Sequence, residues 1–62
     1  MPWNEWRYPP AMRHLAPAAR AKAIEIANAL LAAGMDEGKA IRIAIAKGKE
    51  WAQHHIRPDS QE

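Results

Sequence analysis

The sequence predicts an all-α protein built on one antiparallel helical hairpin. Two segments, at about 17–33 and 37–55, carry apolar residues at helical spacing, and only Gly34, Met35 and Asp36 separate them. Such a short connection favours two neighbouring helices that pack antiparallel. The chain has 62 residues and no cysteine, so we predict a single small domain that lacks disulfide bonds.

The first helix is predicted to begin at Pro17, because proline suits the first helical position. Gly34 supplies the left-handed residue that ends it. The predicted apolar stripe comprises Ala16, Ala19, Ala23, Ile26, Ala27 and Leu30, and is widened by Ile24 and Leu31. Lys22, Glu25 and Asn28 are expected to face away from this stripe.

The second helix is predicted to follow Asp36, a favoured N-cap residue, and to end near His55 before Pro58. Its apolar stripe comprises Ala40, Ile41, Ala44, Ile45, Gly48, Trp51 and Ala52. We expect Gly38, Gly48 and the alanines to let the two backbones approach closely.

The N-terminal segment is rich in proline and aromatic residues, which indicates an extended arm at 1–9 that covers the hairpin. A short helical turn at 10–14 is expected to follow it, because Pro10 suits a first helical position. These elements form one domain at 1–57, and the segment 58–62 is predicted to be a disordered tail.

Several segments together resemble a known family: Ala21 to Leu31, Gly34, Asp36 to Ile41, Lys49 to Ala52, and the opening Met1-Pro2-Trp3. They are similar to the short N-terminal region of the uncharacterised bacterial YdaT-like proteins, over about residues 1–53. A fainter likeness, in helical arrangement more than in residues, is to the ChaB family, named as cation transport regulators. The YdaT resemblance implies a helical unit that precedes another small domain in longer proteins, and thus an adaptor-like or autonomous role.

Catalysis and metal binding are not predicted. The hydroxyl side chains are those of Tyr8 and Ser60, and neither is expected to be held against a base, so we predict no enzyme and no cofactor. The hairpin would bring together three candidate metal ligands, His14, His54 and His55. The sequence has no HxxxH spacing, and histidines in a last helical turn interact favourably with the helix dipole, so we predict no metal site.

We predict instead a small cytoplasmic bacterial protein of the protein-interaction class, which binds a partner protein or forms a homodimer. A thin, alanine-rich core favours self-association, and no apolar segment is long enough for a membrane span. The candidate contact residues are Met35, Ile43, Trp3 and Trp6.

The alternative is a non-specific DNA- or RNA-binding accessory protein. Lys39, Arg42 and Lys49 are predicted to line one side of the second helix, where they could contact phosphates. The acidic start of that helix argues against a helix-turn-helix that recognises base sequence, because such a motif contacts the bases with the first residues of its second helix. A solvated helix face explains the same row equally simply.

Overall fold

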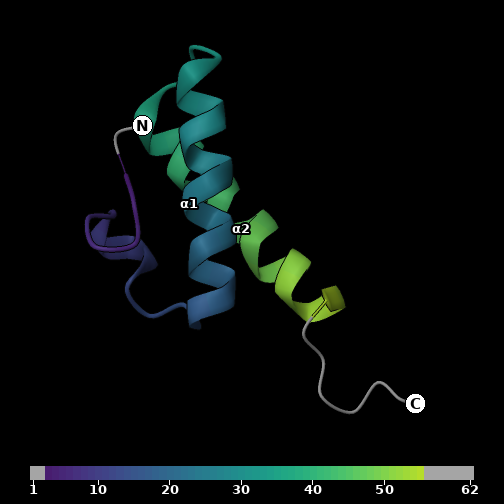
Figure 1. The fold of residues 1–62 in the computed structure, drawn as a ribbon. Helices are drawn as coiled ribbons and strands as arrows, with labels where there is room; N and C mark the ends of the chain where they lie inside the picture. The colour runs from purple at the N-terminus through teal and green to yellow at the C-terminus, as the bar shows by residue number, and fades with distance from the viewer. Residues whose placement is uncertain (1–2, 56–62) are drawn as a thin grey trace.

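The computed structural model describes residues 3–55, with the backbone alone at His55, and it confirms the predicted helical hairpin (Figure 1). A 3-10 helix, η1 (Pro10–Met12), follows the arm. The hairpin consists of α1 (Pro17–Ala32) and α2 (Glu37–His55), which pack against each other. Residues 3–55 contain no strand. The predicted tail at 58–62 lies outside the described residues.

The chain reverses between α1 and α2 through the glycine and aspartate expected there. Gly34 has a φ of 96°, and the N–H groups of Gly34 and Met35 donate to carbonyls in the last turn of α1 at 2.9 and 3.0 Å. The carboxylate of Asp36 accepts a hydrogen bond from the N–H of Lys39 at 3.1 Å, which caps the start of α2. Backbone groups at the C-terminal end of α1 and at the N-terminal end of α2 therefore find hydrogen-bond partners within the turn itself.

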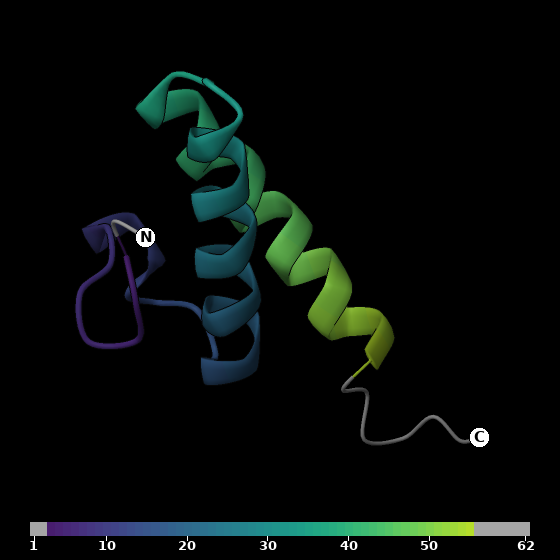
Figure 2. The ribbon, with the colours of Figure 1, turned by 45° about the horizontal axis from the view of Figure 1, so that its top comes forward.

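The two helices cross and diverge toward the C-terminal end of α2 (Figures 1 and 2). They approach closely at Gly48, which is buried: a Cβ atom built there would lie 2.9 Å from the Ala19 carbonyl oxygen and 3.0 Å from the Cβ of Ala23. The prediction of close approach at Gly48 is therefore confirmed. The same prediction does not hold for Gly38, which is exposed in the first turn of α2, where an added Cβ would meet no atom of α1 within 4 Å.

One buried cluster joins the arm, η1 and both helices. It comprises Met12, Leu15, Ala19, Ala23, Ile24, Ala27 and Ala44. Most of its members are alanines, so Met12, which is completely buried, fills a large share of its volume. The side chains of Trp3, Tyr8, Ile41 and Ile45 pack around this cluster. The predicted stripe residue Ala16 is exposed, because it precedes the first turn of α1.

Asn28 was expected to face away from the apolar stripe, but its side chain is buried against the arm and only 4% exposed. Its side-chain NH₂ donates to the Trp3 carbonyl at 3.0 Å, and its Oδ1 accepts from the Trp3 N–H at 3.3 Å. Lys22 does not face away either, because its ammonium lies 5.4 Å from the ring centre of Trp51 on α2. The buried face of α1 is wider than predicted because α1 contacts both α2 and the arm.

Within residues 3–55, neither helix is both long and apolar enough to span a lipid bilayer.

Candidate binding surface

The arm owes its shape to the side chain of Asn4. Asn4 Oδ1 accepts hydrogen bonds from the N–H groups of Trp6 and Arg7, at 2.8 and 2.9 Å. The backbones of Asn4 and Arg7 also bond each other, at 2.8 and 3.2 Å. Asparagine favours such turns because its short side chain reaches the N–H groups two and three residues ahead. The turn fixes the backbone that carries Trp6 and Arg7.

Arg20 of α1 fixes the other end of the arm. Its Nη1 donates to the carbonyls of Arg13 and Leu15, both at 3.2 Å, and its guanidinium lies 5.0 Å from the ring centre of Tyr8. One planar cation thus satisfies two backbone acceptors and covers an aromatic face. Arg20 has a structural role between α1 and the arm.

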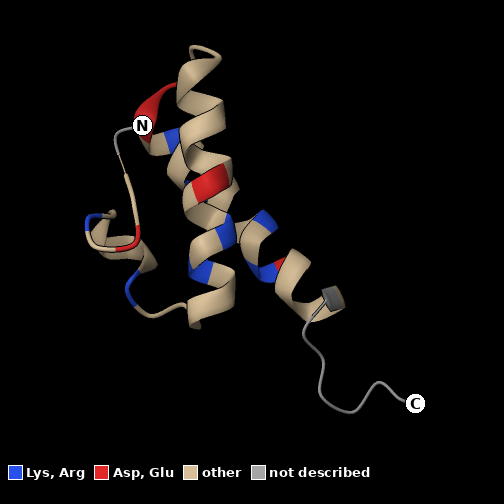
Figure 3. Cartoon of the chain, viewed as in Figure 1, with Lys and Arg blue, Asp and Glu red and all other residues tan. Residues whose placement is uncertain are grey.

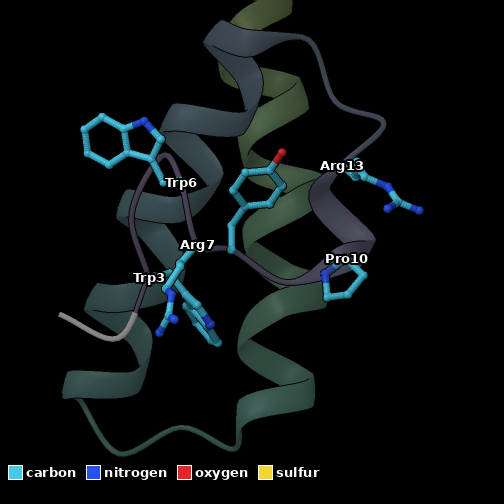
Figure 4. A pocket seen from close by; sticks show the side chains of 6 residues that line it. Trp3, Trp6, Arg7, Pro10 and Arg13 are labelled. Atoms are coloured by element: carbon cyan, nitrogen blue, oxygen red, sulfur yellow. The ribbon is translucent and has the colours of Figure 1, made fainter.

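Between these two fixed points the arm forms an open concavity of about 580 Å³ (Figure 4). Trp6 stands 81% exposed beside it, whereas Trp3 packs against the core. Three rings, a proline and two guanidinium groups make up the lining, and no carboxylate in the described chain contributes to it. The lining residues are Trp3, Trp6, Arg7, Tyr8, Pro10 and Arg13.

The concavity contains two of the four contact residues predicted from the sequence, Trp3 and Trp6. Met35 lies in the hairpin turn and Ile43 on α2; both are half-buried, and neither lines the concavity. Arg7 also lines the concavity and was not predicted as a contact residue. The signal that could have identified it is the order Trp6-Arg7-Tyr8, in which a cation stands between two rings.

The basic row of α2 is a separate surface. Lys39, Arg42 and Lys49 are all exposed on α2, and none of them lines the concavity; Figure 3 shows the basic residues of the helices in blue. The ion pair found among residues 3–55 joins Lys22 and Glu25 on α1, at 3.3 Å, so it does not involve the row.

The structure brings together no set of three metal-ligating side chains within the described part of the chain. His14 and His54 are exposed, and the side chain of His55 lies outside the described atoms. This small all-helical fold gives no positive sign of catalysis.

Comparison with known proteins gives one informative match. The chain is 48% identical over 54 residues to the uncharacterized protein YdaT of Bacillus subtilis (strain 168). The match covers 87% of this chain and 36% of YdaT, so the chain spans about a third of the length of that relative. No family model and no solved structure matches. This helical hairpin with its aromatic arm is therefore YdaT-like over most of its length.

Proposed function

We propose that this chain is a non-catalytic interaction module that binds a protein partner through its N-terminal arm. The observation that carries the proposal is the position of Trp6, which is 81% exposed beside a concavity lined with further rings. A large aromatic side chain left in water at such a site is the usual anchor of a protein interface.

The fixed backbone of the arm supports this assignment. The Asn4 side chain accepts hydrogen bonds from the N–H groups of Trp6 and Arg7, and Arg20 donates to two carbonyls further along the chain. A surface that is ordered before binding loses little conformational entropy when a partner docks, so more of the contact energy appears as affinity.

We expect Trp6→Ala to abolish partner binding without destabilising the fold. Selection of displayed peptides on the immobilised chain should enrich clones that bind the unaltered protein and not the variant. The free energy of unfolding should change by no more than about 0.5 kcal/mol, because Trp6 is exposed. Lys47→Ala is the control, since Lys47 is exposed on α2 and does not line the concavity. Clones that bind Trp6→Ala as tightly as the unaltered protein, or a selection that enriches no clone, would contradict the proposal.

Self-association is a particular case of the same proposal, in which the partner is a second copy of the chain. Sedimentation equilibrium over a wide concentration range measures it directly. A dimer that weakens in Trp6→Ala would assign the arm to the dimer interface. A dimer that persists unchanged would place the interface elsewhere, and Met35 and Ile43 would then be the residues to alter.

The exposed row of Lys39, Arg42 and Lys49 supports a second candidate function, non-specific nucleic-acid binding. In that case a short DNA duplex should shift the amide resonances of α2 at low salt, and the shifts should fade at physiological salt as counterions compete. Arg42→Glu should remove most of the effect, and Arg7→Glu, on the arm, is the charge-matched control. Shifts that survive in Arg42→Glu would argue against the row.

A further inference from the structure

We infer that the segment bound by the arm is acidic: an extended peptide that lays a proline or aromatic residue on the rings and directs carboxylates to Arg7 and Arg13. This inference rests on the proposed function and names the chemistry of the partner. The proposed binding site is the concavity, which does not include the basic row of α2.

The charges of the concavity favour an acidic partner. Arg7 and Arg13 both line it and are exposed, and within residues 3–55 no ion pair or hydrogen bond engages either guanidinium. The guanidinium of Arg20 adds a further positive charge near the ring of Tyr8. No carboxylate of the described chain lines the site. A carboxylate is the natural complement of such a site, because it accepts two parallel N–H bonds from one guanidinium.

The exposed rings of the concavity favour an apolar residue in the bound segment. Trp6 and Pro10 are exposed at the concavity, and Figure 4 shows the side chains of Arg7 and Arg13 on different sides of it. Exposed aromatic rings favour flat or ring-shaped apolar groups, and proline in an extended peptide is one that loses little entropy on docking. The site thus suits an apolar residue flanked by acidic ones.

A nucleic-acid strand fits the same surface less well. Strand binding relies on a groove of cations that follows successive phosphates, with bases stacked on rings beside it. Here two cations line the concavity, and the row of Lys39, Arg42 and Lys49 is on α2 (Figure 3).

The test is a nuclear magnetic resonance titration of the ¹⁵N-labelled full chain with three probes. The first is the capped hexapeptide acetyl-EDPFED-amide, the second its uncharged analogue acetyl-QNPFQN-amide, and the third hexathymidylate. We expect the acidic peptide to shift the arm resonances, including the Trp6 indole N–H, and to bind about tenfold more tightly than the analogue at low salt. The difference should shrink as salt is added.

Arg7→Gln and Arg13→Gln should each weaken binding of the acidic peptide about threefold to tenfold, as expected for single charge-assisted contacts near solvent. Arg42→Gln on α2 is the matched control and should leave the affinity unchanged. Thermal melts of all three variants should coincide with that of the unaltered chain, since these side chains are exposed.

Equal binding of the two peptides, no binding of either, or tighter binding of hexathymidylate to the arm would each overturn the inference. The peptide selection tests the proposed function separately from this inference. If the peptide selection enriches Trp6-dependent clones that are not acidic, the arm is an interaction surface for another kind of partner. If it enriches none, the interaction function is itself refuted.

Discussion

Met12→Ala is expected to destabilise the protein more than any other alanine substitution in the core. Met12 is 0% exposed and is the large side chain that is completely buried in a cluster made mostly of alanines, whereas Leu15 and Ile24 keep 5% and 7% exposure. Removing a buried methionine side chain typically costs about 2–5 kcal/mol, because apolar contacts are lost and a cavity remains. A domain of this size rarely has more than about 3–5 kcal/mol of stability, so the variant should be largely unfolded at room temperature.

Chemical denaturation followed by circular dichroism measures this loss. Met12→Leu preserves the volume and should cost less than about 1.5 kcal/mol. Met35→Ala deletes the same atoms at a half-buried position in the turn, so its effect should be much smaller. An equal loss in the two alanine variants would show that Met12 contributes no more than a partly exposed methionine.

Gly48→Ala should destabilise the hairpin even though alanine is the better helix former. The new Cβ would lie 2.9 Å from the Ala19 carbonyl oxygen and 3.1 Å from the Ala23 nitrogen. Both atoms belong to the backbone of α1, so relief requires the helices to move apart. Overpacking of this kind costs about 1–3 kcal/mol, which exceeds the gain of about 1 kcal/mol that alanine brings to a helix interior.

Gly38→Ala is the matched control, because it makes the same chemical change in the same helix. A Cβ at Gly38 would meet only the Asp36 carboxylate, at an ordinary 3.5 Å. This variant should be as stable as the parent or more stable by up to about 1 kcal/mol. Thermal melts of the pair should therefore shift in opposite directions, and a stabilised Gly48→Ala would disprove tight contact at the crossing.

Short-range signals explain why the fold could be predicted from the sequence. Pro17 starts α1, Gly34 ends it and Asp36 caps α2 through interactions that span only a few residues. Each of these residues acts through its own backbone preference or its own side chain. The predicted segments 17–33 and 37–55 consequently agree with the observed helices to within a residue.

The binding surface could be predicted only in part, because it depends on contacts between distant segments. Trp3 and Trp6 were identified as aromatic residues, but which one is buried is decided by how the arm packs on α1. Asn28 was placed off the apolar stripe because helical periodicity describes one buried face, whereas α1 has two. The hydrogen bonds from Arg20 to backbone carbonyls of the preceding segment could not be read from helical periodicity either, because they depend on how that segment folds back on α1.

The hydrogen bonds between Asn28 and Trp3 also bear on the order in which we expect the fold to assemble. They join residues 25 positions apart, whereas the first contacts between α1 and α2 form across a turn of a few residues. Loop closure grows more costly with loop length, so we expect the hairpin turn to form first and the arm to dock onto a helix that already exists. A ligand that binds the concavity only when the arm is docked would then stabilise the docked arm by mass action.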